Sequence, residues 1–159
     1  MSLAANAPKI ARDKVRTQLA LIDGTITDWT VNLFALGAQT RAYVLDQITP
    51  DMCPWVFATV AAYSLRSTVS AKKEGFVEID VYGIVRADSI RFPGKTPDDL
   101  NLELLIDVLK TIEASPSLTG ADGWLESIDL LEVDLDPEND AWGFTRSRVR
   151  YAINGTLGR

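Results

Sequence analysis

Residues 95–115, KTPDDLNLELLIDVLKTIEAS, carry the start, the body and the end of an amphipathic helix, and they lie between segments that alternate like β-strands. Thr96 is the predicted N-cap and Pro97 suits the first helical position, while the two aspartates that follow complement the helix dipole. The pair Ser115-Pro116 terminates the segment. A chain with one such helix set between strand segments is constrained to an α+β fold.

The apolar residues of this helix recur at intervals of three and four, which predicts one buried stripe. The predicted stripe consists of Leu102, Leu105, Ile106, Leu109 and Ile112. A second helix is predicted from Ala7 to Ile22, where Asn6 can serve as the N-cap and Pro8 lies in the first turn. We therefore expect two helices, of which the one after Thr96 has the stronger signals.

The segment Phe76–Val85 has a clear strand pattern, because its apolar and polar residues alternate. Val77, Ile79, Val81 and Val85 are predicted on the buried face, and Glu78, Asp80 and Tyr82 on the opposite face. The segment Trp55–Ser64 is typical of a buried strand. Residues 66–75, which join the two segments, are polar and small and are predicted to form an exposed, mobile hairpin loop.

Two long strands are predicted near the C-terminus, at residues 124–136 and 141–153. The apolar pattern of the first changes phase between Leu130 and Leu131, which predicts a β-bulge. Residues 24–50 are rich in β-branched and aromatic residues and are expected to add short strands, whose order the sequence leaves open. These elements predict one domain over residues 1–159: an antiparallel or mixed β-sheet with long hairpins, packed against one strong amphipathic helix and an N-terminal helix.

Histidine is absent, and Cys53 is the only cysteine. An internal disulfide is therefore impossible, as are zinc sites built from cysteine and histidine and nucleophile systems that need a histidine base. Catalysis would have to use carboxylates, lysine or tyrosine. We expect no catalytic residues, no cofactor and no metal, so the chain is predicted not to be an enzyme.

The net charge of −6 argues against broad attraction to nucleic acid or to anionic membranes. The N-terminus lacks the apolar core of a signal peptide. The densest apolar run, PWVFATVAAY, has about half the length that a transmembrane helix needs. The sequence therefore predicts a soluble, intracellularly made protein with no membrane partner.

The stretch LEVDLDPENDAW, residues 131–142, places an acid at every second position from Asp134 to Asp140. An EF-hand loop spaces its ligands in a similar way, but it needs glycine at its sixth position and glutamate at its twelfth, where this chain has Asn139 and Thr145. The flanking residues are also strand-like rather than helical. A hairpin turn at DPEND is therefore favoured over a calcium site.

The sequence Gly94-Lys95-Thr96 lies between a strand and a helix, where a phosphate-binding P-loop would end. The first glycine of that motif would fall at Ser89. In addition, Pro93 and Pro97 remove backbone N–H groups from the place where phosphates would bind. The segment is therefore interpreted as a loop and a helix cap, in preference to a nucleotide site.

Arg146, Arg148 and Arg150 occupy alternate positions and share one face of the last predicted strand. We favour charge pairing, either across neighbouring strands or between subunits, over nucleic-acid binding. The candidate acidic partners, between which the sequence does not choose, are Glu78 and Asp80, or Glu132 and Asp134. The predicted charge-pairing site consists of Glu78, Asp80, Arg146, Arg148 and Arg150.

The order of elements from Pro54 onward resembles the tail terminator, or tail completion, proteins of long-tailed bacteriophages. In that family a strand, a loop of variable length and a second strand precede one amphipathic helix, and a closing β-hairpin ends in an aromatic-containing strand. The corresponding segments here are residues 54–64, 66–75, 76–85, 99–115 and 128–153. The N-terminal helix also fits. The family carries no catalytic residues to transfer.

The resemblance implies a structural virion protein that forms a ring, usually a hexamer, at the head-proximal end of the tail. Such a ring caps the tail tube, stops its polymerisation and offers a docking surface to head connector or stopper proteins. DNA would pass through the lumen without specific binding, and assembly would take place in the host cytoplasm. The alternatives are another head–tail joining protein or a tube subunit and, from a different class, a small calcium- or nucleotide-binding domain.

Overall fold

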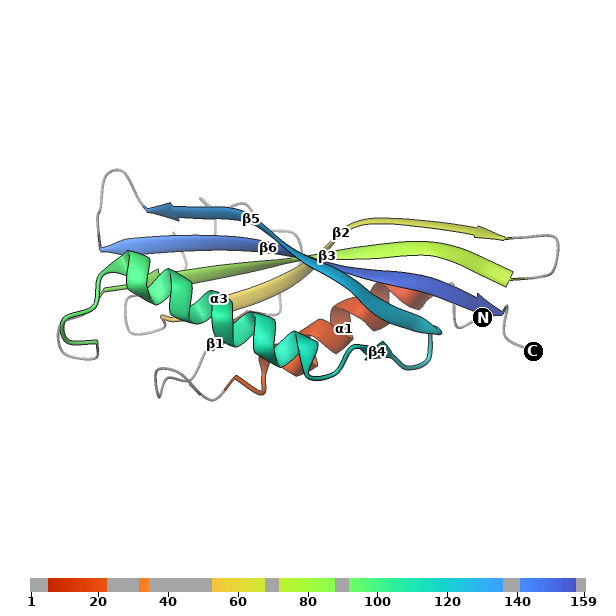
Figure 1. Cartoon of the computed structure of the whole chain (residues 1–159), viewed down its shortest axis with the longest axis horizontal. Helices are drawn as coiled ribbons and strands as arrows, with labels where there is room; N and C mark the ends of the chain where they lie inside the picture. The colour runs from red at the N-terminus through yellow and green to blue at the C-terminus, as the bar shows by residue number, and fades with distance from the viewer. Residues whose placement is uncertain are drawn as a thin grey trace.

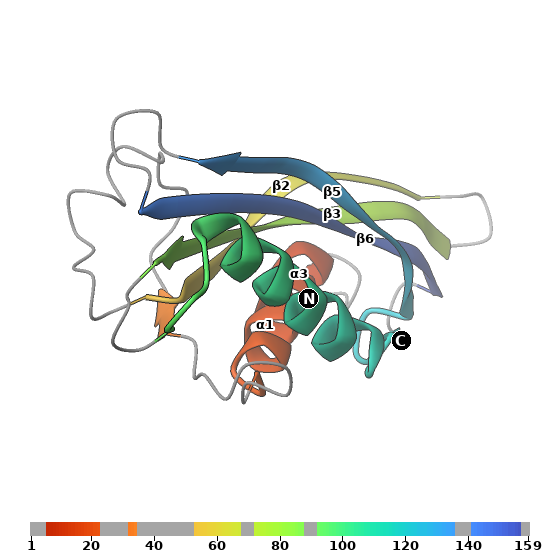
Figure 2. The same cartoon turned by 60° about the vertical axis from the view of Figure 1, so that its left-hand side comes forward.

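The computed structural model describes residues 6–22, 32–34, 53–67, 72–87, 92–135 and 141–156. Its strands form one sheet in the order β1-β2-β3-β6-β5-β4. The strands are β1 (Asn32–Phe34), β2 (Trp55–Ser67), β3 (Lys72–Arg86), β4 (Ser117–Leu118), β5 (Gly123–Leu135) and β6 (Trp142–Thr156). The helices α1 (Ala7–Leu19) and α3 (Pro97–Glu113) lie on the same face of the sheet (Figures 1 and 2). The predicted α+β fold is confirmed.

Two long antiparallel hairpins form the middle of the sheet: β2 pairs with β3, and β5 pairs with β6. β3 and β6 pair with each other from Lys72↔Thr156 to Arg86↔Trp142 and so join the hairpins. The short β1 runs parallel to the start of β2, which makes the sheet mixed. β1 falls within residues 24–50; any further strand predicted there lies outside the described residues.

The main core lies between the sheet and the two helices, and its strand residues follow the predicted alternation. Val77, Ile79, Val81 and Val85 of β3 are all at most 2% exposed. β6 contributes Val149, Tyr151 and Ile153 to the same cluster, and α1 contributes Ala7, Ala11, Val15 and Leu19. Because side chains alternate along a strand, the residues between these on β3 and β6 point to the face without helices.

A second buried cluster lies on that opposite face, near the end of the sheet where β2 begins and β3 ends. It consists of Cys53, Trp55, Phe57, Ile84, Trp142 and Phe144. Tyr82 packs against it, and its ring stacks on Phe57 with centroids 4.7 Å apart. Aromatic pairs of this kind add about 0.5–1.5 kcal/mol beyond area burial. Both faces of the sheet therefore contribute to its packing.

Helix α1 is shorter than predicted and begins differently. It ends at Leu19 rather than Ile22, because Ala20 continues into a turn whose N–H groups bond back to carbonyls of the last helical turn. The Asn6 side chain makes no capping hydrogen bond. The helix is instead held by its buried face and by Pro at its start, and Asp23-Gly24 lies outside the described residues.

Helix α3 begins at Pro97, as predicted, and Thr96 is its N-cap. Thr96 and Asp99 together form a capping box. The Asp99 backbone N–H donates to Thr96 Oγ1 at 3.2 Å, and the Thr96 N–H donates to Asp99 Oδ2 at 3.0 Å. The hydrogen bond from the Thr96 backbone lowers the pKa of the Asp99 carboxyl. This reciprocal arrangement satisfies two N–H groups that a helix start would otherwise leave unpaired.

The predicted buried stripe of α3 is wrong in part. Leu105 and Ile112 are buried, but Leu102 and Ile106 are 50% and 42% exposed. The residues that face the core are Leu100, Asn101, Leu104, Leu105, Asp107, Val108 and Ile112. α3 has apolar residues on two adjoining sides. The side that faces the sheet also contains the polar residues Asn101 and Asp107, so the sequence pattern favoured the other side.

This correction predicts unequal effects of two leucine-to-alanine substitutions in α3. Leu104→Ala removes a fully buried side chain, so we expect the free energy of unfolding to fall by about 2–5 kcal/mol. Leu102→Ala removes a half-exposed side chain and should cost less than about 1 kcal/mol. Urea unfolding of the two purified variants measures the difference. Equal losses of unfolding free energy in the two variants would contradict this assignment of the buried side of α3.

The predicted loop at residues 66–75 is also wrong over most of its length. β2 extends to Ser67 and β3 begins at Lys72, so the hairpin continues well into this segment, and only residues 68–71 lie outside the described part. Arg66 opposes Glu74 across the strands, and the two side chains form an ion pair at 3.3 Å. Arg66 is exposed and Glu74 is partly exposed, so these polar residues are compatible with paired strands.

The outer half of β2 differs from the buried strand predicted at Trp55–Ser64. Residues 55–58 are buried, whereas residues 61–64 are exposed. The register shifts between Val60 and Ala62, at the point where this change begins. The bulge predicted in β5 is confirmed between Leu130 and Glu132, and a second one, between Leu125 and Ser127, was missed.

Tyr151 is fully buried, and its hydroxyl has no hydrogen-bond partner among the described residues. Burial raises the pKa of Tyr151 to about 12. In the unfolded chain this tyrosine would ionise near its ordinary pKa of 10. Its contribution to stability is therefore complete below pH 10 and is lost as the pH rises towards 12.

We expect Tyr151→Phe to leave stability at pH 7 unchanged or higher, because it removes a buried hydroxyl without a partner. Between pH 10 and 12 the wild type should lose on the order of 2 kcal/mol more than the variant. Thermal melts across this range measure the difference. The exposed Tyr63 offers the matched control, Tyr63→Phe, which should track the wild type. A Tyr151→Phe curve parallel to the wild type would contradict the expectation.

Candidate functional site

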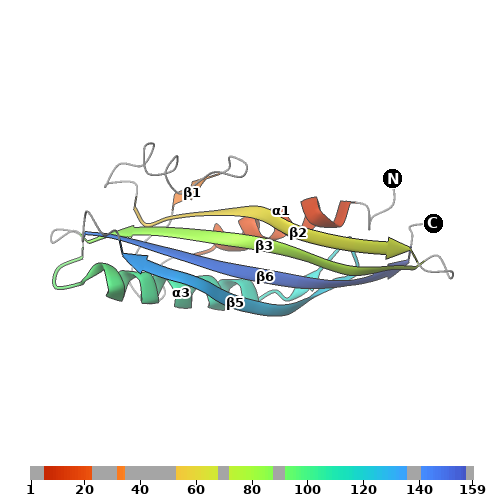
Figure 3. The same ribbon diagram turned by 90° about the horizontal axis from the view of Figure 1, so that it is seen from above.

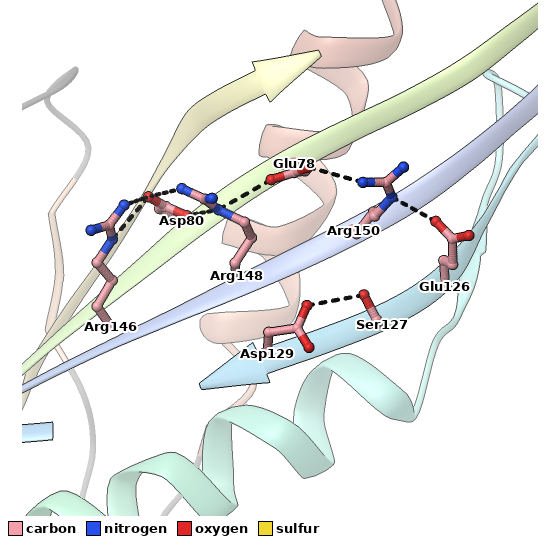
Figure 4. A network of polar contacts seen from close by, with 8 residues as sticks. All are labelled: Glu78, Asp80, Glu126, Ser127, Asp129, Arg146, Arg148 and Arg150. Atoms are coloured by element: carbon pink, nitrogen blue, oxygen red, sulfur yellow. Dashed lines mark hydrogen bonds and ion pairs between the residues drawn. The ribbon is translucent and has the colours of Figure 1, made fainter. Parts of the chain in front are cut away.

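The face of the sheet without helices carries a row of arginines and carboxylates across β3, β6 and β5 (Figure 4). Arg146, Arg148 and Arg150 project from β6 because alternate residues of a strand share one face. The register places Arg150 opposite Glu78 and Arg148 opposite Asp80 on β3. The structure thus brings together the five residues singled out from the sequence.

Asp80 is the centre of the row and accepts hydrogen bonds from two arginines. Arg146 donates to its Oδ2 from Nε at 3.0 Å and from Nη2 at 2.7 Å. Arg148 donates to Oδ1 from Nε at 2.8 Å and to Oδ2 from Nη2 at 3.2 Å. Asp80 is only 3% exposed, so this carboxylate is stabilised by charge-assisted hydrogen bonds rather than by bulk water.

The row continues from Arg148 to β5. Arg148 Nε lies 3.2 Å from Glu78 Oε2, and Arg150 Nη1 lies 3.1 Å from Glu78 Oε1. Arg150 Nε also donates to Glu126 Oε2 at 2.7 Å. The chain of contacts therefore connects three adjacent strands, with three guanidinium groups facing three carboxylates (Figure 4).

The electrostatic consequence is a set of arginines fixed in their charged form. Hydrogen bonding to Asp80 raises the pKa of Arg146 and of Arg148, although partial burial opposes this. Arg150 also lies over the ring of Phe76, with its Cζ atom 4.0 Å from the ring centroid, and Arg146 lies 5.7 Å from the centroid of Tyr82. Aromatic contacts of this kind restrict the guanidinium planes further.

This arrangement is suited to holding strands in register rather than to chemistry. A catalytic acid or base needs a pKa near the working pH and access to a substrate, whereas these arginines remain charged and contact carboxylates. Opposite charges on neighbouring strands stabilise their pairing, and a slip by one residue would move the paired side chains of one strand to the other face of the sheet. We name Glu78, Asp80, Glu126, Arg146, Arg148 and Arg150 the charge row.

Glu126 is the member of the charge row that the sequence reasoning missed. A bulge between Leu125 and Ser127 places it beside Arg150. A signal was present, because Leu125 and Ile128, which both pack on the core, are three residues apart, and an unbroken strand would place such residues two or four apart. Glu132 and Asp134, the other candidate acids, oppose Arg146 and Phe144 in the register.

The glycine–lysine segment before α3 has the structural role predicted for it. Lys95 forms an ion pair with Glu103, two turns into the helix, and Thr96 caps the helix. Both side chains are therefore engaged within the loop and α3.

The acidic stretch is described only at its two ends. Asp134 lies in β5, and Thr145 is buried in β6. Residues 136–140, which hold the predicted turn and the other candidate ligands, lie outside the described residues. The preference for a hairpin turn over a calcium site therefore stays a prediction. Within the described part of the chain, no group of three or more acidic, cysteine or histidine side chains is placed to hold a metal ion.

The cavity beside the charge row is too small for a typical ligand. It has a volume of about 50 Å³ and is lined mainly by apolar side chains, including Phe57, Tyr82, Ile84 and Phe144. Ligand sites usually have volumes of about 300–1,000 Å³. Neither described helix combines the length and the apolar character needed to span a bilayer.

Comparisons with known proteins identify no family. No family model matches the sequence, and no curated protein matches it. Among solved structures, one similar chain belongs to the structure described as "Virion of native gene transfer agent (GTA) particle". The likeness has a TM-score of 0.42 with 12% sequence identity and covers 96% of this chain and 98% of that chain. A likeness at this level assigns neither a function nor a partner.

Proposed function

We propose that this protein is a structural virion protein that forms a ring on the end of a phage tail tube. The observation that carries the proposal is the order of the elements along the chain: hairpin β2–β3, helix α3 and closing hairpin β5–β6. The two hairpins form one sheet, and α1 lies on the same face of that sheet as α3 (Figure 2). This is the order on which the resemblance to tail terminator proteins rests. The ring would stop tube growth and offer a surface to head connector proteins.

The charge row supports this role because it makes the centre of the sheet resistant to slippage. A ring subunit transmits contacts from one neighbour to the next, and a sheet with a fixed register keeps the geometry of its two sides constant. The pairing of β3 with β6 over their full lengths serves the same end. The net charge of −6 also suits a channel through which DNA passes without binding.

The function is tested on growing tail tubes. Purified protein added to tube subunits that are polymerising should halt elongation and remain bound at one end, where electron microscopy would show a distinct terminal ring. Each tube should stop at the length it had when the protein was added. Continued elongation at the original rate, with no protein on the tube ends, would refute the proposal.

The same assay separates the neighbouring roles. A tube subunit would be incorporated along the tube and would lengthen it. A connector adaptor would leave free tubes unaffected and would bind only to tubes that already carry a terminal ring. Only a terminator both stops elongation and supplies the surface on which a connector then docks.

A further inference from the structure

One lateral side of the molecule is acidic and apolar. It is formed by β5 and α3, which lie next to each other at one edge of the sheet (Figure 3). β5 carries four acidic residues and no basic one, and α3 carries five acidic residues, of which Asp107 is buried, and one lysine. We name this surface the β5–α3 side.

Most of the exposed large hydrophobic residues in the described part of the chain lie on the same side. They are Leu102 and Ile106 of α3 and Trp124, Leu130, Leu131, Val133 and Leu135 of β5. Several of these β5 side chains are about half exposed. An apolar centre with charged residues around it is the usual composition of a protein–protein interface.

β5 is also open along its outer edge. β4 pairs only with Gly123 and Trp124, and no described strand pairs with the rest of β5 on that side. Soluble proteins usually protect such an edge or use it for association. The two bulges in β5 interrupt a continuous ladder, so side-chain contacts are better suited to this edge than a long run of added backbone pairs.

Among the described residues, the opposite lateral side carries mainly basic charges. It is formed by α1 and β2, with α1 beneath β2 and β3 (Figure 3). α1 carries four basic residues and one aspartate, and the only charged residue of β2 is Arg66. Beyond Phe57, no described strand pairs with β2 on its outer edge, and Arg16 Nη2 donates to the carbonyl of Ala58 at 3.1 Å. We name this surface the α1–β2 side.

We propose that the β5–α3 side of one copy docks on the α1–β2 side of the next copy. The occupant follows from charge: an acidic side meets a basic side only in head-to-tail order, whereas two β5–α3 sides would bring like charges together. Head-to-tail contacts close into a ring when the rotation between copies permits it. The inference deepens the proposed ring function and rests on it, because it names the two surfaces that meet.

The test exchanges the charges of exposed residues that lie outside the charge row. Variant A carries Asp129→Lys and Glu113→Lys, which reverse two exposed charges on the β5–α3 side. Variant B carries Lys9→Glu and Arg66→Glu, which reverse two exposed charges on the α1–β2 side. Lys9 and Arg66 have side chains 70% and 78% exposed, and Asp129 and Glu113 are also exposed. Because Arg66 pairs with Glu74 and Asp129 lies opposite Arg148, circular dichroism checks that both variants fold.

Each variant alone should require at least about tenfold more protein than the wild type to assemble, because the two reversed charges on one side would meet like charges on the other. Mixed in equal amounts, A and B should form alternating rings again, since A then meets B at both joints. Light scattering and electron microscopy of the two variants and their mixture measure this. The wild type should also assemble less well as salt is raised.

The outcomes distinguish the two proposals. If the wild type forms rings but A and B assemble as well as it does, the joint lies elsewhere and the ring function stands. If both variants fail to assemble and the mixture fails too, charge complementarity between these sides is refuted. A wild type that stays monomeric at every concentration overturns the joint and the ring together.

Discussion

Replacing Asp80 with asparagine is expected to lower the free energy of unfolding by about 2–4 kcal/mol. Asp80 is 3% exposed and accepts hydrogen bonds from both Arg146 and Arg148. The substitution keeps the side-chain size but removes the carboxylate that both arginines contact, while Arg148 keeps its contact with Glu78. Breaking a buried pair costs about 3–5 kcal/mol, and the lower figure used here reflects the arginines, whose side chains are about a third exposed.

The matched control for Asp80 is Glu126→Gln, at the exposed end of the charge row. Within the charge row Glu126 contacts Arg150, and its side chain is 52% exposed. Its loss should cost less than about 1 kcal/mol, as for other solvent-exposed ion pairs. Chemical denaturation of both variants measures the two values. If Asp80→Asn were no more costly than Glu126→Gln, the charge row would not hold the sheet.

Replacing Gly75 with alanine is expected to cost about 3 kcal/mol or more. Gly75 has a φ of +154°, and an added Cβ would lie 1.8 Å from the carbonyl oxygen of Ser64. The obstacle is backbone on the partner strand, so the strand itself has to move. Because Gly75 pairs with Leu65 on one side and Ile153 on the other, the shift should disturb both β2–β3 and β3–β6.

Gly94→Ala separates conformational strain from this collision. Gly94 also has a positive φ, +77°, but an added Cβ would meet no atom within 4 Å. The expected cost is therefore the strain alone, about 1–2 kcal/mol. Hydrogen exchange should show faster opening of the β2–β3 hairpin in Gly75→Ala and unchanged protection there in Gly94→Ala. Equal costs for the two variants would mean that the sheet absorbs the collision freely.

Local signals in the sequence predicted the parts of the fold that local forces determine. The cap at Thr96, the proline after it and the alternation of β3 act over a few residues, and the structure confirms each of them. The buried side of α3 depends instead on distant residues. Asn101 is buried against Gly143, where an added Cβ would lie 2.6 Å from its Oδ1, and this contact turns Leu102 outward.

The extent of the β2–β3 hairpin was not predictable from composition for a related reason. Residues 66–75 are mostly small or polar, and this composition is also typical of loops. Residues 72–75 are held in a strand by pairing with β6 up to Thr156, which is far away in the sequence. Alternation identifies a strand only where one face is buried.

For the site, the spacing of Arg146, Arg148 and Arg150 was enough to place them on one face, but not to choose their partners. That choice depends on β6 lying between β3 and β5, which is a property of the whole sheet. The position of Glu126 depends in turn on a bulge. The apolar β5–α3 side was hidden in part because Leu102 and Ile106 of α3 were expected to be buried.

Imaging the purified wild-type protein by electron microscopy, together with a mass measurement of the particles in solution, tests the central claim most directly. If copies join through unlike sides, the particles should be closed rings of one stoichiometry, whose mass is a whole multiple of 17.5 kDa. A single species at the monomer mass, at all concentrations up to those at which tubes assemble, would contradict it.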